Sequence, residues 1–524
     1  MMSREPVPAF VKAMGHRIVG YVLNISETEA RRVLTLDYRL SNQQRVTFAS
    51  YLELCRHLRD DALSQGDTER SFFQRLPRAR QSETHIFNVW HYQHNGKFIV
   101  PYSEDVLAYR VCLLAAELYP LFLVKTATKR HMFYRMSGHL SATIAQTPEY
   151  KQLCHAFLGD ASFERLFEEI SNDPFETLGR YSDSRGHKSV ISLASLPAAL
   201  LLNSYDLMRA RGPISQRIFV STVKEMLDTA RGLADGEVAQ IPLFVGFRNA
   251  SLGNLDELAT KWGVWRRYSP AIAEYVLQTP KAMARRKSSG FILESGMSYA
   301  INVGELVDDD EWPDEVLVAE EERLSTEYNI SMCLALCYLN NKSSFTAPEW
   351  VWTIDPFSLE GGHRLVDTVA ETDHPVVIEK SHLDDIEQWS LLLEDTDSTG
   401  IRLAFSRLVS AAQFPSATDG LLDAMIAFRN IFAAGSHPER IRDAVTKLLA
   451  GETTGVLELV DRIEQAWEAV FTGDVWYDKE EIAELTQSCI SLCLVCLHHL
   501  YLKHRELVSD PIRLEKLVTL DGNS

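Results

Sequence analysis

The strongest constraint on the fold lies in residues 380–508, where segments with apolar residues at three- and four-residue spacings follow one another across short connections. In one segment Leu421, Met425, Phe428 and Phe432 share a helical stripe, and a second stripe runs through residues 482–499. Because each stripe must be buried against another element, this part of the chain predicts an all-α bundle.

The remainder of the chain mixes both periods. Residues 16–25 and 32–40 are rich in β-branched and aromatic side chains and predict strands, and Asn95-Gly96 between two such runs predicts a hairpin. From residue 104 the spacing becomes helical, with strand-like runs at 291–307 and in the Trp-rich stretch at 348–357.

These patterns predict a mainly α, multidomain protein, since 524 residues exceed what one hydrophobic core holds. The expected units are a small α/β or β-rich unit at 1–103, a helical middle region at 104–318, a connecting segment with Trp-rich strands at 319–375, the helical bundle at 376–508 and a tail at 509–524.

Composition limits the possible functions and the compartment. The net charge of −19 argues against a chain built mainly to coat nucleic acid or an anionic membrane. No apolar run reaches the roughly 18 residues of a membrane span, and the N-terminus lacks the pattern of a secretory signal. The eight cysteines do not form the dense framework of a small secreted domain, so we expect a cytoplasmic protein.

Three segments of the C-terminal part carry a family resemblance: IAFRNIF at 426–432, DAVTKLLAG at 443–451 and IEQAWEAVFTG at 463–473. In order and residue pattern, this part of the chain resembles the HEPN superfamily (higher eukaryote and prokaryote nucleotide-binding), in particular its Apea-like branch of prokaryotic defence proteins. The resemblance covers residues 380–508. It implies a helical bundle, usually dimeric, that in family enzymes cleaves RNA with an Arg and a His from one helix end.

The chain departs from that family pattern at the catalytic positions. Aligned on Gly473, the Arg and His positions are Trp467 and Thr472, and the acidic residue usual in the first helix is Arg429. Trp carries no charge and Thr cannot shuttle protons near neutral pH. The resemblance therefore implies a non-catalytic binding or assembly subunit of a prokaryotic antiphage or stress-defence system, with Trp467, Phe471 and Thr472 on a dimer or partner face.

The partners that this reading implies are a protein, such as a catalytic subunit of the same system, and RNA or DNA, in a homo- or hetero-oligomer. The alternative is a metal-independent ribonuclease with displaced residues, either Arg429, Asn430 and His437 or the pair Arg180 and His187. A third reading is a sensor that binds a phage component through the N-terminal and middle regions.

A second candidate site lies in residues 248–287, where basic and aromatic side chains interleave. Cationic groups for phosphates and rings for base stacking are the expected chemistry of single-stranded nucleic-acid binding. The same surface could instead dock against the acidic stretch at 308–315 or an acidic partner. The candidate residues are Arg248, Lys261, Trp262, Trp265, Arg266, Arg267, Lys281, Arg285, Arg286 and Lys287.

Neither a metal nor a cofactor is expected. Cys489, Cys493 and Cys496 precede His498 and His499, but all lie on one apolar helical run, where buried thiols are favoured over converging zinc ligands. The chain has no GxxxxGK[ST] or GxGxxG phosphate-binding pattern, and no GxSxG or HExxH motif.

Overall fold

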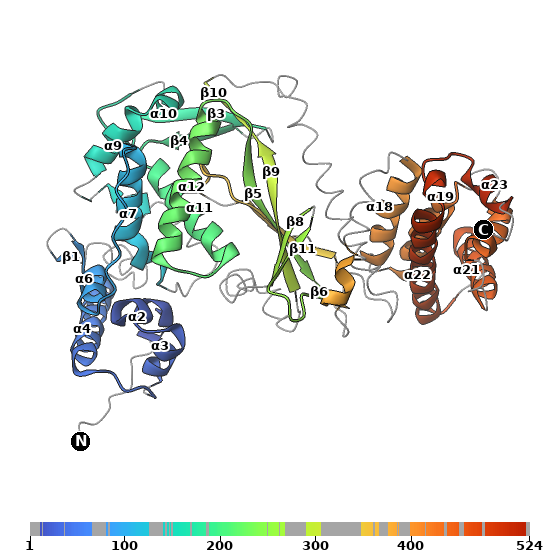
Figure 1. Cartoon of the computed structure of the whole chain (residues 1–524), viewed down its shortest axis with the longest axis horizontal. Helices are drawn as coiled ribbons and strands as arrows, with labels where there is room; N and C mark the ends of the chain where they lie inside the picture. The colour runs from blue at the N-terminus through green and yellow to red at the C-terminus, as the bar shows by residue number, and fades with distance from the viewer. Residues whose placement is uncertain are drawn as a thin grey trace.

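The computed structural model of the chain is mainly α-helical with several small sheets (Figure 1). It describes residues 11–124, 140–267, 290–304, 347–365, 376–386 and 399–519, with gaps at 13, 36, 65–79, 82–83, 142–143, 146, 148–149, 168–169, 185–187, 249, 261, 360–361, 385, 414–415, 434–437, 450–454 and 474–476.

The N-terminal region is helical, so the strands predicted at 16–25 and 32–40 are wrong. In their place lie α2 (His16–Leu23) and α3 (Glu27–Leu34), followed by α4 (Asn42–Ser64) and α6 (Ile86–Gln93). Within the described part of residues 1–103, the strands are the two-residue β1 (Arg80–Gln81) and β2 (Thr84–His85). The β-branched residues of α2 favour a strand in the sequence, but in the structure they are buried on one face of a helix.

A local signal explains the start of α3. Ser26 and Glu29 form a reciprocal capping box there, which fixes the entry into the helix.

The predicted hairpin at Asn95-Gly96 is also wrong, because the pair lies in the turn that directly follows α6. Asn95 takes a left-handed φ of 62°, and the Gly96 amide donates to the His91 carbonyl at 3.1 Å.

The helical character expected after residue 104 is confirmed for α7, α9, α10, α11 and α12. Phe219 of α12 packs among rings of α7 and α11, with centroids 5.2 Å from Phe122 and 5.9 Å from Tyr205. The bounds are Val106–Phe122 (α7), Tyr150–Leu158 (α9), Ala161–Leu166 (α10), Leu196–Arg211 (α11) and Gln216–Ala234 (α12).

Arg231 joins three of these helices. Asp105 and Asp160 cap the N-termini of α7 and α10, and both carboxylates also accept from the Arg231 guanidinium of α12, at distances from 2.5 to 3.0 Å. Hydrogen bonding to Arg231 lowers the pKa of Asp105 to about 2, so the carboxylate is ionised across the physiological range.

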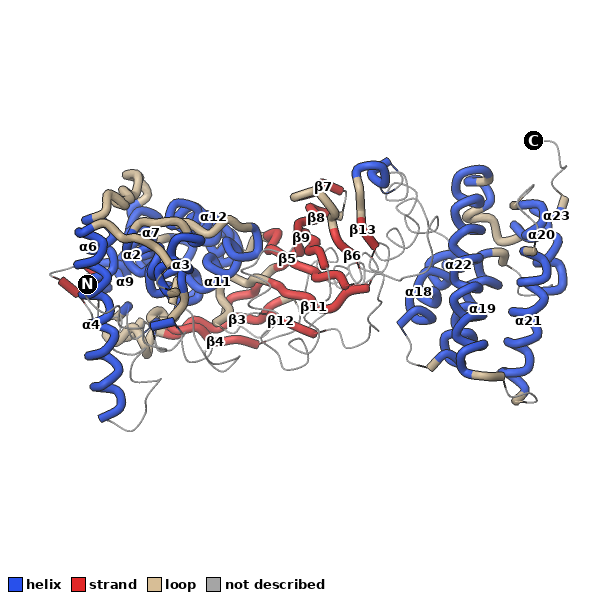
Figure 2. The backbone as a smooth tube through the Cα atoms, turned by 90° about the horizontal axis from the view of Figure 1, so that it is seen from below, coloured by secondary structure: helices blue, strands red, loops and turns tan. Residues whose placement is uncertain are grey.

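A six-stranded antiparallel sheet follows, in the order β12-β11-β5-β9-β8-β7, and its centre is the long pair β5 and β9. Figure 2 shows it between the N-terminal and middle helices and the C-terminal helices. The bounds are Ala239–Arg248 (β5), Glu257–Thr260 (β7), Gly263–Arg267 (β8), Gly290–Tyr299 (β9), Ala347–Thr353 (β11) and Gly362–Leu365 (β12).

This sheet crosses the expected boundary at residue 318, and it places β5, β7 and β8 in the middle region 104–318, where the sequence predicted helices and a strand-like run at 291–307. The Trp-rich strand β11 pairs with β5, so residues from both expected units share one sheet. A smaller sheet has the order β10-β3-β4, and β13 pairs with β6 in parallel. The bounds are Leu178–Asp183 (β3), Lys188–Ser192 (β4), Ala250–Ser251 (β6), Ile301–Val303 (β10) and Val376–Val377 (β13).

The C-terminal helical bundle is confirmed, with both predicted stripes facing inward. Leu421, Met425, Phe428 and Phe432 are all buried. The central helix α22 (Lys479–Lys503) packs against α18 (Thr399–Gln413), α19 (Ala417–Ile431), α20 (Ile441–Leu448) and α21 (Val456–Thr472).

The expected separate tail belongs to the bundle as far as α23 (Arg513–Val518), which packs on α20. Arg513 is buried, and its guanidinium donates to the carbonyl oxygens of Asn430 and Ile431, both at 2.6 Å. It thereby satisfies acceptors that the C-terminus of α19 leaves open.

By length and composition, α22 could cross a membrane. Much of its surface is instead buried against the other bundle helices, including Cys489, Leu497 and Leu500. A helix at the core of a bundle is apolar on most of its faces, as a membrane-spanning helix is, so it passes the same test of length and composition.

Asp206 of α11 is 5% exposed, and burial raises the pKa of its carboxyl from 3.8 to about 7, with Arg209 lowering it only in part. The folded protein therefore favours the protonated acid. This contribution to stability is complete below the unfolded pKa and is lost as the pH rises toward 7. We predict that Asp206→Asn raises the unfolding free energy at pH 8 by about 2–4 kcal/mol and has little effect at pH 4.

Urea unfolding of both proteins at pH 4, 6 and 8 measures this difference. Asp256→Asn, at a side chain that is 96% exposed, is the matched control and should leave the profile unchanged. A difference between Asp206→Asn and the original chain that does not grow with pH would contradict the prediction.

Candidate functional site

Trp467 and Thr472, which the resemblance aligns with the family's catalytic Arg and His, lie toward the exposed C-terminal end of α21. The helix ends at Gly473, which takes a left-handed φ of 73°. The Trp467 and Phe471 rings, one helical turn apart, are stacked with centroids 5.4 Å apart and planes 17° apart. Trp467 is half-buried, whereas Phe471 is 71% exposed.

Arg429 of α19 completes this group of rings. Its guanidinium carbon lies 3.9 Å from the centroid of the Trp467 ring, in a close cation–π contact. The Arg429 Nε is buried and has no hydrogen-bond partner among the described residues, so the aromatic face is its principal neighbour there. We call Arg429, Trp467 and Phe471 the α21 stack.

The polar groups beside the α21 stack are held by their own helices. The Thr472 hydroxyl donates to the Glu468 carbonyl at 2.9 Å, and the Asn430 amide donates to the Ile426 carbonyl at 2.8 Å. Burial raises the pKa of Glu464, and the charge of Arg429 opposes that rise. Of the displaced catalytic set, Arg429 and Asn430 are therefore engaged locally, while His437 lies outside the described residues.

Of the other displaced pair, Arg180 and His187, the structure describes only Arg180. This residue is exposed on β3, directly opposite Val190 of β4, whose side chain is 62% exposed. His187 lies outside the described residues, so its position relative to Arg180 stays a prediction.

The structure corrects the role expected for the two tryptophans of the basic and aromatic segment. Trp265 is fully buried and Trp262 is 7% exposed. Their rings are parallel, with centroids 6.1 Å apart, and Trp265 also packs on Phe291 at 5.1 Å. Rings in this position are part of the core of the sheet and offer no platform to a nucleobase.

Two arginines of the segment, Arg266 and Arg267, have protein partners. Arg266 donates to Glu257 at 2.5 Å and to Glu294 at 2.9 Å, and Arg267 donates to the carbonyl oxygens of Gly253 and Leu255. Both are therefore engaged by groups of β7, of β9 and of the loop that precedes β7.

For Arg248 the structure gives only the backbone position, at the end of β5. The remaining candidates of the segment lie outside the described residues: Lys261, Lys281, Arg285, Arg286 and Lys287.

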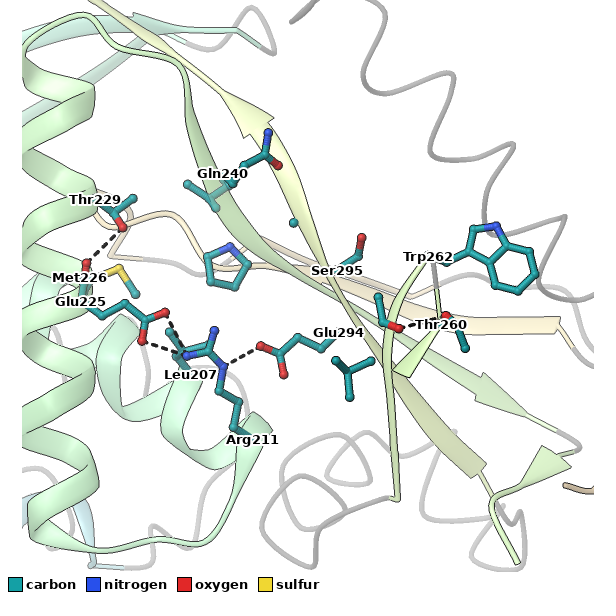
Figure 3. A pocket seen from close by; sticks show the side chains of 15 residues that line it. Leu207, Arg211, Glu225, Met226, Thr229, Gln240, Thr260, Trp262, Glu294 and Ser295 are labelled. Atoms are coloured by element: carbon teal, nitrogen blue, oxygen red, sulfur yellow. Dashed lines mark hydrogen bonds and ion pairs between the residues drawn. The ribbon is translucent and has the colours of Figure 1, made fainter. Parts of the chain in front are cut away.

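Sequence reasoning missed a charged network beside this segment. A cavity of about 420 Å³ is lined by residues of α11, α12 and the sheet, and Arg211 reaches from α11 toward the sheet there (Figure 3). The Arg211 guanidinium donates to both oxygens of Glu225 at 2.9 Å and to Glu294 at 2.6 Å. Glu294 in turn accepts from Arg266, so one carboxylate joins a helix end to a neighbouring strand.

This network, which we call the Glu294 clamp, has no sequence signal, because Arg211 and Glu294 are 83 residues apart. Its carboxylates already accept from guanidinium groups. The arrangement is therefore suited to holding the helical layer on the sheet, and its carboxylates are not poised as free acids or bases.

The thiols of α22 lie inside the bundle. Cys489, Cys493 and Cys496 are fully buried and free, and burial raises the pKa of Cys493 and of Cys496. Across the described residues, no three His, Cys, Asp or Glu side chains are grouped to hold a metal ion.

Comparisons with known proteins give no relative to this chain. No protein-family model matches it, and no curated protein and no solved structure matches it.

We predict that Glu294→Ala lowers the unfolding free energy by about 2–3 kcal/mol, because it leaves two guanidinium groups without their shared carboxylate. Glu294 is only 12% exposed. The matched control is Glu257→Ala, at a carboxylate that is 62% exposed, where the loss should stay below about 1 kcal/mol. Urea unfolding of the three proteins gives the comparison, and equal losses in the two variants would contradict the role of the clamp.

Proposed function

We propose that the chain is a non-catalytic, HEPN-like binding and assembly subunit of a prokaryotic antiphage or stress-defence system. It acts in the cytoplasm and recognises a protein partner through the exposed end of α21. The proposed family relationship rests on the residue patterns and the order of the segments at 426–432, 443–451 and 463–473.

One observation carries the non-catalytic part of the proposal, the contact between Arg429 and Trp467 at 3.9 Å. The resemblance aligns Trp467 with the catalytic Arg, and Arg429 with the acidic residue of the first helix. An acid and an arginine on these two helices would attract each other as charges. Here the cation is on α19 and an aromatic face on α21 receives it, so the contact holds the helices together without a group that could stabilise a phosphorane at Trp467.

The exposed ring of Phe471 supports a partner-binding role. Arg429 lies over the Trp467 ring and Trp467 stacks on Phe471, so the α21 stack presents the Phe471 ring to solvent. Trp, Tyr and Arg dominate the energetic centres of protein interfaces, where large rings are buried without much loss of conformational entropy. A catalytic subunit of the same system, or a second copy of this chain, is the partner class that the proposal implies.

The metal-independent ribonuclease is the alternative function. Arg429 is engaged with Trp467, which weakens the set that includes Asn430 and His437. The pair Arg180 and His187 retains an exposed cation on β3.

Cleavage of labelled single-stranded RNA with and without EDTA separates the two functions. The proposal expects no cleavage by the purified chain in either condition. EDTA-insensitive cleavage that is lost in His437→Ala or in His187→Ala would overturn it and establish the ribonuclease.

We predict that Phe471→Asp disrupts assembly while leaving the fold intact, because the ring is 71% exposed and contributes little to the bundle core. Light scattering after size exclusion should show a lower mass for the variant than for the original chain, alone or with the co-expressed partner subunit. The control is Leu502→Asp, at an apolar side chain of α22 that is 41% exposed and lies away from the α21 stack in sequence and on another helix. Assembly that survives Phe471→Asp would exclude this face.

A further inference from the structure

The small sheet of β10, β3 and β4 ends at an open edge. The strand order places β4 outermost, so among the described strands it pairs with β3 alone, and Figure 2 shows it along the outer margin of the strands. A strand in this position presents backbone amide and carbonyl groups that a further extended chain can bond. This edge belongs to the middle region, so an interaction here is independent of the function proposed for α21.

The hydrogen-bond pattern identifies the groups of β4 that face outward. Just beyond the strand, the Leu193 amide donates to the Thr177 carbonyl at 2.9 Å, so these two opposite residues form a hydrogen-bonded pair. Bonding alternates along antiparallel strands, and Val190 and Lys188 lie an odd number of steps from Leu193. Their backbone groups therefore point away from β3, and no described residue outside β3 forms a backbone hydrogen bond with either of them.

The side chains at this edge combine exposed cations with exposed apolar groups. Val190 is 62% exposed and lies directly opposite Arg180 of β3. Leu178 and Lys188, each two residues away from one of these positions, are exposed on the same face. Acidic residues outnumber basic ones by 72 to 53 in this chain, yet neither cation is paired with a carboxylate in the part that the structure describes.

The charge of the edge decides which extended chain fits it. A lysine on an edge strand disfavours pairing with a like strand. A second copy of β4 would bring Lys188 and Arg180 of both copies to one junction without a counter-charge. A strand that offers a carboxylate beside Lys188 and an apolar side chain beside Val190 complements both features of the edge.

We propose that β4 is a docking edge for an extended acidic segment of a partner protein, which adds to the three-stranded sheet as a further strand. In the antiparallel arrangement, an apolar residue of that segment lies opposite Val190 and exchanges backbone hydrogen bonds with it. An acidic residue two positions away lies opposite Lys188. Backbone bonds supply the affinity, and the alternating acidic and apolar side chains supply the specificity.

Isothermal titration of the full chain with a synthetic peptide tests this assignment. The probe is Thr-Glu-Thr-Val-Thr-Glu-Thr, acetylated and amidated at its ends, whose Val and Glu side chains share one face of a strand. We expect a Kd on the order of 100 μM, and binding at least about tenfold weaker for the same peptide with Lys in place of both Glu residues.

N-methylation of the probe tests the backbone contact directly. Methylation of the central Val should abolish binding, because that amide faces β4 in the proposed pairing. Methylation of the Thr that follows it is the matched control, because that amide faces away from β4, and it should leave binding in place.

Two variants of the chain locate the site. Lys188→Glu should weaken binding of the acidic peptide at least about tenfold and strengthen binding of the Lys peptide, a reversal that loss of folding cannot produce. Val190→Pro should abolish binding of both peptides with little change in the thermal unfolding midpoint, because proline removes only an amide that faces outward. The matched control is Lys97→Glu, at an exposed cation that follows α6, and it should bind the acidic peptide normally.

No heat of binding with the acidic peptide up to about 2 mM, equal binding of the two peptides, or binding that Lys188→Glu retains would each overturn the assignment. Light scattering of the full chain and of Val190→Pro, each without peptide, examines the other occupant. Self-association that this variant abolishes would assign the edge to a second copy of the chain and would also overturn the proposal.

Discussion

The carboxylate of Glu294 is the interaction on which the middle of the molecule depends. It receives one guanidinium from the end of α11 and another from β8, so a single acidic side chain of β9 fixes a helix to the sheet and a strand to its neighbour. Arg211 carries the connection onward to α12 through Glu225. Without these contacts the cavity between the layers would be lined by unpaired charges, which is costly in a partly desolvated space.

The same use of arginine recurs in the other parts of the chain. Arg231 holds the capping carboxylates of α7 and α10, and Arg513 holds the last carbonyl oxygens of α19. Arg513 satisfies carbonyl oxygens that a helix end leaves open, whereas Arg231 binds the carboxylates that cap two helices. These partners are 71 to 126 residues away in the chain. Although the chain carries a net charge of −19, several of its cations are therefore placed at internal junctions and are withheld from an external polyanion.

The sequence predicted the elements whose signal is local and failed where the partner is distant. The C-terminal helices are predictable because their apolar stripes are long and regular. Ile18, Val19 and Val22 are β-branched and favour a strand at residues 16–25, where the protein instead forms α2. The capping box of Ser26 and Glu29 was the overlooked local signal of helix. The strand β5 was missed for a different reason. Pro242 argues against a central strand, because proline has no amide hydrogen to donate to a neighbouring strand. It lies just beyond the residues of β5 that pair with β11, and its carbonyl oxygen still accepts from the Ile354 amide at 2.9 Å.

The candidate sites show the same limit. The tryptophans and arginines at 262–267 are compatible both with a nucleic-acid surface and with a sheet that buries the rings. Only the pairing of β8 with β9 reveals that Trp265 faces the core. The contact of Arg429 with Trp467 joins two helices that are 38 positions apart at these residues, and sequence spacing cannot express it. A cavity of about 500 Å³ at the start of α12 has no sequence signal either, because it forms only where α2, α6, α7 and the residues after α11 meet.

The buried thiols of α22 have a consequence for how the C-terminal bundle can be observed. A thiol reacts with an alkylating reagent as the thiolate and only when the reagent reaches it, and burial suppresses both conditions at Cys493 and Cys496. Their modification therefore requires the helices of the bundle to separate. The rate at which these sulfur atoms are alkylated in the folded protein would report the opening frequency of the bundle, so the chain contains a natural probe of its own local unfolding.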